Sequence, residues 1–395
     1  MVSVSVPGIG FIHVTNVTQD QGATIYLPRE AGIRNPSSVK ETKKTVIVIA
    51  TENVSVHGYY FEIGTASSTD AWFILPTIAL GGDYIAVGYH SATHGSRNHF
   101  SEFVVTAIED NTTVYITGQR ELSMTLQRYE SYQFVSDGVD LTDVTGMYIN
   151  TDKPVSVMSG HQCAKVPVNE VGCDYLMEHL PPLTILGHHY ILSPFLGRTS
   201  GYIYRVVSVS PGTTHMSLSG ESISLSNGEI YEGNVVTSNE VLIIMVDKPV
   251  MVVQYAKGSS TDGFGDPFMV VIPSIQKFSN NVTFPSFGRD QLQHYISIIT
   301  PGCDSITLFN LDGLPLNNVN WLQSSHGEFC ILRSSVNSGF HSVTHPSASF
   351  LVLVYGFGPS VSYGFVARCQ FHTEGESIVM SLIFSKILDT YAIGK

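Results

Sequence analysis

The sequence predicts an all-β protein made of tandem antiparallel β-sandwich-like repeats of about 90–105 residues, and three observations support this class. Short segments of alternating apolar and polar residues are separated by turns rich in Gly, Asn, Asp and Pro. The same phrases recur along the chain. The chain holds 35 Gly, 20 Phe and 19 Tyr, yet charged residues make up only 13%, about half the ~25% of an average soluble domain. A propeller-like arrangement of large blades is the alternative, although a usual blade has only ~40–50 residues.

The composition argues against several other classes of protein. Acidic residues outnumber basic ones by 33 to 20, which gives a net charge of −13, whereas nucleic-acid binding needs clustered positive charge. Ala, Glu, Lys, Leu and Arg together fall well short of the half share that is typical of a coiled coil. With 43% hydrophobic residues and a mean hydropathy of +0.14, the chain can bury enough apolar surface to fold. We therefore expect a globular β protein with no nucleic-acid partner.

One recurring phrase marks the start of each repeat. It begins at Leu75, Leu180 and Ile272, each followed by proline, and it runs into a strand that carries Tyr84 in the first case and Tyr190 in the second. The boundaries that follow are 1–74 for a partial first β repeat, 75–179 for a second repeat with a Cys163/Cys173 loop, 180–271 for a third, 272–367 for a fourth and 368–395 for a C-terminal tail or junction.

A second recurring phrase is Asp-Lys-Pro followed by β-branched residues. It occurs as Thr151-Asp-Lys-Pro-Val155 and as Val246-Asp-Lys-Pro-Val250, with degenerate versions at 51–56 and 345–352. Proline has no N–H for a neighbouring strand and restricts the residue before it, so it interrupts one strand. The Val-rich residues that follow then predict a buried strand.

The two ends of the chain carry separate signals. The first residues alternate with period two and lack the basic start and apolar run of a secretory signal peptide, so we expect this chain to be a fragment whose true start is missing. No run of apolar residues reaches the ~18–20 of a transmembrane segment. Residues 377–391 show helix-like apolar spacing, with too few cations for a membrane-surface helix, which favours a terminal packing segment.

Cysteines and glycosylation sequons favour an extracellular location. Cys163 and Cys173 would close a short loop, Cys303 and Cys330 a longer one, and Cys369 is left over as a free or intermolecular thiol. Five reduced, buried thiols are the alternative. Four Asn-x-Ser/Thr sequons support secretion, at Asn16, Asn53, Asn111 and Asn281. Disulfides and N-glycans both belong to oxidising, extracellular settings.

Two stretches resemble a known family. Residues 151–167, which contain His161-Gln-Cys163, and residues 172–182, which contain Cys173-Asp174, closely resemble the signature of the IgGFc-binding protein N-terminal domain family. Further likeness lies in 201–207, 247–255, 265–269 and 354–364, so the resemblance covers roughly residues 1–367. Asn53-Val54 stands where the family's first Lys-Pro would fall, so the entry turn of the first repeat departs from the pattern.

The resemblance implies a non-catalytic extracellular module of a secreted, mucus or adhesion glycoprotein. Immunoglobulin Fc binding gave that family its name, but no short motif carries this activity, so it is not transferred to any residue of this chain. We therefore predict a non-enzymatic binding or adhesion module that acts by protein–protein interaction with extracellular proteins or glycoproteins. A disulfide-linked partner through Cys369 is part of this prediction.

The sequence also offers residues for metal binding, none of them in a typical metal-site pattern. A zinc site can be drawn from His161, Cys163, Cys173 and His179, but the paired Cys-x2-Cys spacing of such sites is missing, which favours a disulfide. His188 and His189 are adjacent on a predicted strand and would point to opposite faces. Acidic clusters that begin at Glu109 and Asp137 would offer calcium three or four oxygens, fewer than the six to eight that it takes.

The sequence predicts no catalytic residue, no cofactor and no metal ligand. Neither Gly-x-Ser-x-Gly nor His-Glu-x-x-His occurs in the chain. A carbohydrate-binding module is the first alternative to protein binding, although only two tryptophans, Trp72 and Trp321, are present to form an aromatic shelf. A hydrolase is the less favoured alternative, with His161, His188, His189 and His215 as its candidate bases.

Overall fold

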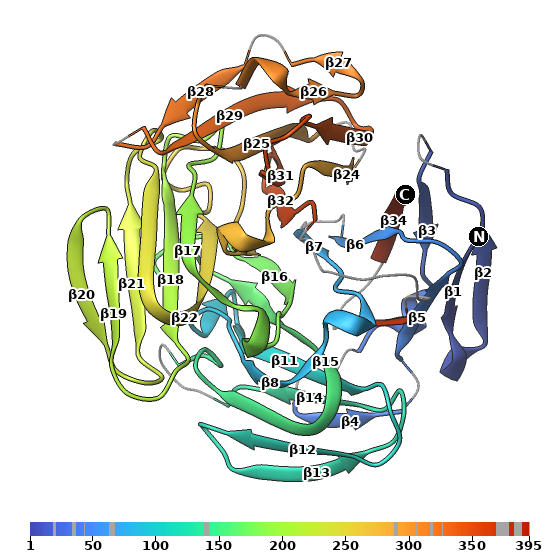
Figure 1. Cartoon of the computed structure of the whole chain (residues 1–395). Helices are drawn as coiled ribbons and strands as arrows, with labels where there is room; N and C mark the ends of the chain where they lie inside the picture. Colours follow the sequence, from blue (N-terminus) through green and yellow to red (C-terminus); the bar gives the residue numbers. More distant parts are fainter. Residues whose placement is uncertain are drawn as a thin grey trace. The chain divides into compact units, whose positions relative to one another are not determined.

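The computed structural model describes residues 1–18, 21–33, 37–42, 44–62, 68–137, 142–287, 291–304, 306–316, 319–325, 327–368, 379–382 and 389–394 (Figure 1). All pairings between the strands of these residues are antiparallel, and none of these residues lies in an α-helix. The helical elements are short 3₁₀ turns: η1 (Pro7–Ile9), η2 (Arg29–Ala31), η3 (Thr77–Ala79), η4 (Leu183–Ile185), η5 (Ile275–Lys277) and η6 (Ile306–Leu308). The all-β prediction is confirmed.

The chain divides into two compact units. The first comprises Met1–Ile185 together with His372–Lys395, and the second comprises Leu186–Phe371. Each unit contains one large curled sheet built around a single long strand. The rest of each unit is a similar arrangement in which the long strand is divided, so that it forms two smaller sheets. The repeat boundaries at 74, 179, 271 and 367 stay a prediction.

The complete sheet of the first unit is built around one unusually long strand, β15. Its first part pairs with β12 and β8, and its second part pairs with β11 and β16. At 17 residues β15 is far longer than the usual 5–6, and Asp152-Lys153-Pro154 lies between the two parts. The strands are β4 (Val39–Glu41), β8 (Gly81–Ile85), β11 (Ser101–Ala107), β12 (Thr112–Thr117), β13 (Leu122–Leu126), β14 (Ser131–Val135), β15 (Tyr148–Ala164) and β16 (Asp174–His179), with a separate hairpin of β9 (Ala92–His94) and β10 (Arg97–His99).

The second unit repeats this arrangement around β22. The first part of β22 pairs with β19 and β17, its second part pairs with β18 and β23, and Asp247-Lys248-Pro249 lies between them. The strands are β17 (Gly187–Leu192), β18 (Tyr202–Ser208), β19 (Thr214–Leu218), β20 (Glu221–Leu225), β21 (Ile230–Val235), β22 (Leu242–Ala256) and β23 (Phe268–Val271). The same strand order in both units shows that the recurring phrases encode a recurring sheet.

Asp-Lys-Pro ties the bend of each long strand to the hairpin beside it. Asp152 Oδ1 accepts a hydrogen bond from Thr113 N at 2.8 Å, and the Lys153 ammonium donates to the carbonyl of Asp110. In the second unit Asp247 Oδ1 accepts from His215 N at 2.7 Å, and Lys248 Nζ donates to Pro211 O at 2.7 Å. Aspartate and lysine thus replace the ladder bonds that proline interrupts.

Tyr84 and Tyr190, the tyrosines that follow the Leu-Pro motif, also bond to the long strands next to Asp-Lys-Pro. Tyr84 OH donates to Val155 O at 2.7 Å, and Tyr190 OH donates to Val250 O at 2.7 Å. Each hydroxyl also accepts a hydrogen bond from the glycine three residues earlier in its own strand, at 2.9 Å. Both tyrosines are buried, so each hydroxyl satisfies a carbonyl that water does not reach.

Glycine begins each of these two strands because the next repeat packs closely against it. A Cβ atom on Gly81 would lie 2.8 Å from Pro182 Cβ, and one on Gly187 would lie 2.3 Å from Ser274 Oγ. Pro182 and Ser274 belong to the next copies of the Leu-Pro phrase. Within each unit, therefore, the start of one repeat contacts the start of the following one.

The remainder of the second unit forms two sheets in which the long strand is divided. β30 and β31 are separated by residues 345–350, the degenerate version of the Asp-Lys-Pro phrase. One sheet has the order β24-β30-β26-β27, and the other has the order β28-β29-β25-β31-β32. The strands are β24 (Asn281–Ser286), β25 (Gln293–Pro301), β26 (Asn310–Leu311), β27 (Leu314–Pro315), β28 (Asn320–Gln323), β29 (Phe329–Val336), β30 (Gly339–Thr344), β31 (Leu351–Gly358) and β32 (Val361–Val366).

The remainder of the first unit is divided in the same way, at residues 51–54, and strands from the chain's C-terminal segment complete it. β33 pairs with β5, and β34 pairs with both β6 and β3. The described parts of 377–391 are strands, so the helical conformation suggested by the apolar spacing of that segment is wrong there. The strands are β1 (Val2–Val6), β2 (Phe11–Thr15), β3 (Ala23–Tyr26), β5 (Val46–Ala50), β6 (Ser55–Glu62), β7 (Ser68–Phe73), β33 (Val379–Leu382) and β34 (Asp389–Gly394).

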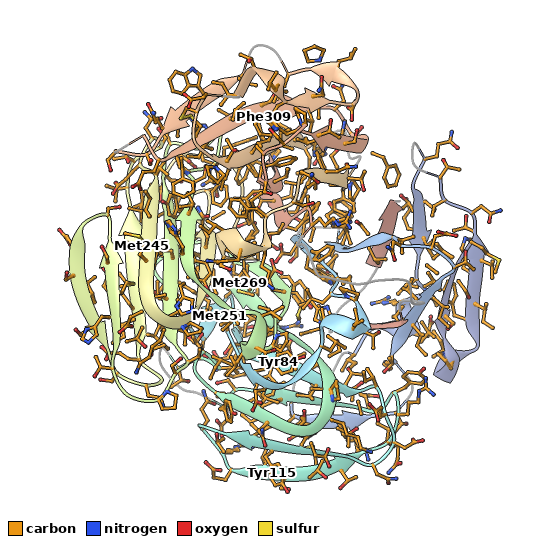
Figure 2. The ribbon with its side chains drawn as sticks, viewed as in Figure 1. Tyr84, Tyr115, Met245, Met251, Met269 and Phe309 are labelled. Atoms are coloured by element: carbon orange, nitrogen blue, oxygen red, sulfur yellow. A yellow bond between two sulfur atoms is a disulfide. The ribbon has the colours of Figure 1, made fainter. Side chains whose placement is uncertain are left out.

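Each unit has its own apolar core. Figure 2 shows side chains such as Tyr84 and Met251 turned inward, while Tyr115 and Met245 point outward from their strands. Aromatic rings are prominent in the core of the second unit, where Phe195 packs edge-on against Phe268 and Tyr355 with ring centroids 4.8 and 5.2 Å apart. Most aromatics of the chain are thus core residues, as expected for alternating strands.

Candidate functional site

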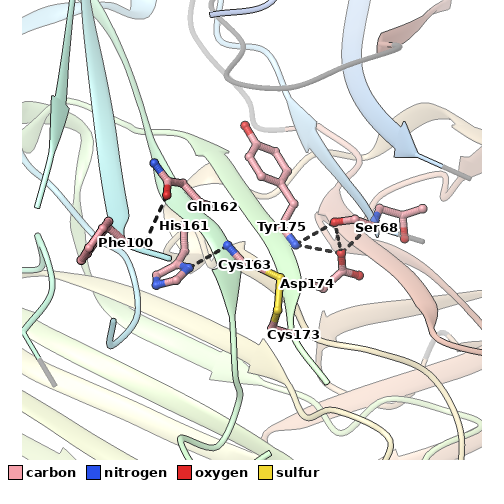
Figure 3. The surroundings of a disulfide bond; sticks show 9 residues. Ser68, Phe100, His161, Gln162, Cys163, Cys173, Asp174 and Tyr175 are labelled. Carbon is pink, nitrogen blue, oxygen red and sulfur yellow. Dashed lines mark hydrogen bonds between the residues drawn. A yellow bond between two sulfur atoms is a disulfide. The ribbon is translucent and has the colours of Figure 1, made fainter. Parts of the chain in front are cut away.

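The sequence signature at 161–174 forms a disulfide-closed loop (Figure 3). Cys163, at the end of β15, is bonded to Cys173, which lies ten positions later and directly before β16. His161 accepts a hydrogen bond from Cys163 N at its Nδ1 atom, 3.0 Å away. Because the two sulfur atoms are bonded to each other, the zinc interpretation of this cluster does not fit the structure.

Two buried carboxylates next to this loop join β16 to β7. Asp174 accepts from Thr69 N at 2.9 Å, from its neighbour Tyr175 N at 2.7 Å and from the Ser68 hydroxyl. Asp70, on β7, accepts from Met177 N at 2.9 Å. The two aspartates act as acceptors for backbone amides, which is a structural role.

His161, a candidate base, and His179, a member of the zinc set considered above, are buried and neutral. Burial lowers the pKa of each to about 3. His179 Nδ1 accepts from Leu75 N at 3.0 Å, so its Nε2 carries the proton and donates to Ser156 Oγ at 3.1 Å. A histidine in this tautomer cannot take a proton from the serine, so the pair has no general-base function.

The other candidate bases lie apart from one another. His188 Nδ1 is 3.3 Å from Val246 O, while the neighbouring His189 packs edge-on against Phe329, 5.3 Å away, as expected for adjacent strand residues. His215 Nδ1 is 3.1 Å from Ser224 Oγ, but this pair is on the exposed surface of two neighbouring strands. Both side chains are exposed to solvent, whereas hydrolytic sites usually exclude water.

The acidic clusters form turns and ion pairs. Asp110 Oδ1 accepts from Arg128 N at 3.1 Å, and Asn111 adopts a left-handed turn conformation with φ 53°. Asp137 pairs with Arg120, and Asp143 lies 3.5 Å from His90 Nδ1. Asp140 lies outside the described residues. Over the described ranges, no group of three or more His, Cys, Asp or Glu side chains is placed to hold a metal ion.

The remaining predicted site residues are surface positions or cysteines. All four sequon asparagines are exposed, as attachment of a glycan requires: Asn16, Asn53, Asn111 and Asn281. Cys303 is bonded to Cys330, 27 positions away. Cys369 lies outside the described residues. Among the helices of the described part of the chain, none is long and apolar enough to cross a membrane.

The second unit contains a polar cleft of about 550 Å³ that the sequence did not indicate. The starts of β25 and β30, the end of β29 with the turn that follows it, and the Asp312-Gly313 turn between β26 and β27 form its walls. Leu292, Gln293, His294 and Tyr295 contribute from the β25 side, and Ser335, Asn337, Ser338 and His341 from the opposite side.

An aspartate–histidine pair anchors one wall of this cleft. His341 Nδ1 is 2.8 Å from Asp312 Oδ2, and His341 Nε2 is 2.8 Å from Asn337 O. Asp312 Oδ1 in turn accepts from Ser342 N at 2.7 Å. No local feature of the sequence marks this pair, because residues 293, 312 and 341 meet only through the pairing of β26 with β30 and the packing of the two sheets.

Comparisons with known proteins identify the family. The family model described as IgGFc binding protein matches residues 70–356, well over half of the chain. The human IgGFc-binding protein is 24% identical in an alignment of 356 residues that covers 82% of this chain but only 6% of that relative. No solved structure matches the chain. The chain spans a small part of its relative's length, and on the family match it belongs to the IgGFc-binding protein family.

Proposed function

We propose that this chain is a non-enzymatic extracellular binding or adhesion module of a secreted or cell-surface glycoprotein, and that it acts through protein–protein contacts. The observation that carries the proposal is the family match over residues 70–356, because the family is described by a binding activity. The human relative is likewise named as a binding protein. An adhesive role in mucus is the finer form of the same proposal.

Two structural features support an extracellular setting. Disulfides such as Cys163–Cys173 and Cys303–Cys330 persist in oxidising compartments and are rare in the cytosol. The four exposed sequon asparagines are available to an oligosaccharyltransferase in the secretory pathway. Rigid sheets closed by disulfides also offer preformed surfaces, which lower the entropic cost of binding.

The Fc fragment of immunoglobulin is not assigned as the partner. The relative's name says what that protein binds, and this chain covers only 6% of it. No residue described above has a geometry that singles out an Fc surface. Fc therefore enters the experiment as one candidate among extracellular proteins.

Catalysis is not part of the proposal. His161 and His179 are buried and neutral, His179 is held in a tautomer that cannot deprotonate Ser156, and the His215–Ser224 pair is exposed. These observations support a binding module over a hydrolase.

A capture experiment tests the proposal. The full 395-residue chain is secreted from animal cells, immobilised and incubated with native mucus or extracellular fluid, and bound proteins are identified by mass spectrometry. The same chain after reduction and alkylation serves as the control. We expect at least one extracellular protein, Fc included, to bind the native chain and, once purified, to bind it directly; failure of every enriched protein to bind directly would contradict the proposal.

The proposal includes an intermolecular disulfide through Cys369. With Cys163, Cys173, Cys303 and Cys330 paired, Cys369 is the fifth cysteine of the chain. On a gel of the secreted chain we expect a dimer or mixed-disulfide band that disappears on reduction and in Cys369→Ser. Identical monomer bands with and without reductant would exclude the linkage.

A further inference from the structure

We propose that the polar cleft between β25, β29, β30 and the β26–β27 turn binds a neutral saccharide unit of a glycan. The cleft belongs entirely to the second unit, and the protein-binding proposal assigns no role to it. Its volume of about 550 Å³ falls within the ~300–1,000 Å³ of small-ligand sites and is too small for a folded partner domain.

The rim of the cleft offers the hydrogen-bonding groups that a sugar needs. Sugar hydroxyls both donate and accept, and so do the amides of Gln293 and Asn337 and the hydroxyls of Ser335 and Ser338. All four side chains are exposed at the cleft. Tyr295 OH donates to Gln293 Oε1 at 2.6 Å, which orients that amide and leaves its nitrogen to donate to a ligand.

Asp312 is the acidic residue among those that line the cleft, and its carboxylate is already engaged. Asp312 Oδ2 lies 2.8 Å from His341 Nδ1, and His341 Nε2 lies 2.8 Å from Asn337 O, so both ring nitrogens of His341 face a partner within the wall. No Lys or Arg is among the described residues that line the cleft, so phosphate or sulfate would find no cation to pair with. Both Asp312 oxygens already accept hydrogen bonds, so a metal ion would have to displace them.

Two adjacent residues of β25 that line the cleft, His294 and Tyr295, are each held by a neighbouring aromatic residue. The Tyr295 ring stacks on Tyr355 with centroids 5.9 Å apart and an interplanar angle of 24°. His294 Nδ1 is 2.9 Å from Tyr363 OH, and burial, with the nearby His341, lowers the pKa of His294 to about 4, so this ring is neutral at extracellular pH. An aromatic wall beside convergent polar groups is the usual composition of a small-ligand site.

The strands that carry these groups hold them in place before a ligand arrives. Gln293 and Tyr295 lie on β25, which pairs with β29 and β31 along nearly its whole length. Asp312-Gly313 is a two-residue turn with φ 53° and 77°, and Asp312 N donates to Ser342 O at 2.9 Å. A rigid site loses little entropy on binding, which favours recognition of a small polar ligand.

A glycan array tests the proposal directly. The full chain, freed of its own N-glycans, is applied to neutral, sialylated and sulfated glycans, and a positive neutral sugar is then titrated by calorimetry. We expect saturable binding to a neutral sugar. The double variant Gln293→Ala/Asn337→Ala should bind that sugar at least about tenfold more weakly, because two hydrogen-bonding side chains are lost. Asn234→Ala, an exposed asparagine on β21, is the matched control and should bind like the parent.

Three results would overturn the proposal: no neutral sugar binds, only charged glycans bind, or the double variant binds the sugar as well as the parent does. Thermal unfolding of each variant shows whether the chain is still folded. A second double variant, Ser335→Ala/Ser338→Ala, probes the same wall through different groups and is expected to weaken binding as well. The protein partner from the capture experiment should bind the Gln293→Ala/Asn337→Ala variant normally, so the two proposals fail separately.

Discussion

The phenolic hydroxyl of Tyr84 donates a hydrogen bond to the main-chain carbonyl of Val155, 2.7 Å away and 71 positions later in the chain. Tyr190 makes the same bond to Val250 at 2.7 Å in the second unit. In each case the carbonyl belongs to the residue after Lys-Pro, where the long strand bends. One contact therefore links two phrases that recur in the sequence.

Removing this hydroxyl should destabilise the unit that contains it. In Tyr84→Phe the Val155 carbonyl and the Gly81 amide both lose a buried partner, which costs about 1–3 kcal/mol of unfolding free energy. Tyr190→Phe should lose a similar amount. Urea unfolding followed by circular dichroism measures the change. Tyr115→Phe, at a residue that is 48% exposed, is the control and should change the free energy of unfolding by less than about 0.5 kcal/mol. Equal midpoints for the parent and Tyr84→Phe would contradict this role.

A buried ion pair in the second unit predicts acid sensitivity. Arg198 Nε is 2.8 Å from Asp262 Oδ2, and both side chains are almost fully buried. Burial alone would raise the pKa of Asp262, but hydrogen bonds from Arg198 and from the Ser200 and Thr199 segment lower it below its usual range.

The sign of the pH effect follows from that lowered pKa. The unfolded chain binds the proton more readily, so the stabilisation is complete above the unfolded value of about 3.9 and is lost as the pH falls through the lower folded value. Asp262→Asn should lose roughly 3–5 kcal/mol at neutral pH, because the Arg198 charge is left buried and unpaired, and should show a flatter acid limb. The exposed Asp304→Asn is the control; an Asp262→Asn variant with parental stability at pH 7 would refute the argument.

Loss of the Cys163–Cys173 bond should weaken the first unit. Closing a loop of ten positions restricts the unfolded chain and is worth roughly 3 kcal/mol. We expect Cys163→Ala/Cys173→Ala to unfold at lower urea concentration than the parent. The comparison with Cys303→Ala/Cys330→Ala, which opens a longer loop in the other unit, shows whether each bond stabilises its own unit. Unchanged unfolding in both double variants would show that the bonds do not form.

Because the sequon asparagines are exposed, we expect them to carry N-glycans when the chain is secreted by animal cells. Each of the substitutions Asn16→Gln, Asn53→Gln, Asn111→Gln and Asn281→Gln should lower the apparent mass by one glycan. Treatment with a peptide N-glycosidase should bring all variants to one mass. A secreted chain whose mass does not change on that treatment would rule out glycosylation at these sites.

Local signals explain what was predicted from the sequence. Proline has no N–H, so Asp-Lys-Pro was expected to end one strand and begin another. β15 and β22 instead run through it as single strands, and what changes there is the partner strand. Short alternating segments bounded by Gly, Asn and Asp predict strands for similarly local reasons. The nearness of Cys163 and Cys173 in the sequence likewise made their pairing the favoured interpretation.

Long-range pairing explains what the sequence did not predict. Nothing local says that Tyr84 reaches Val155, or that residues near 380 and 390 pair with β5 and β6. The helix-like spacing at 377–391 was misleading because a short apolar segment has no unique period, and strand pairing decides its conformation. The cleft at Gln293, Asp312 and His341 was missed for the same reason, since it forms only when sheet edges meet.

The central claim, that this chain binds an extracellular protein without altering it, is tested most directly by one binding measurement. Surface plasmon resonance of the intact chain over the purified capture partner is combined with the mass spectrum of that partner after prolonged incubation. We predict saturable binding that is lost after reduction of the disulfides, and a partner whose mass is unchanged. A partner that is cleaved or otherwise modified, or that binds the reduced and native chains equally well, would contradict the claim.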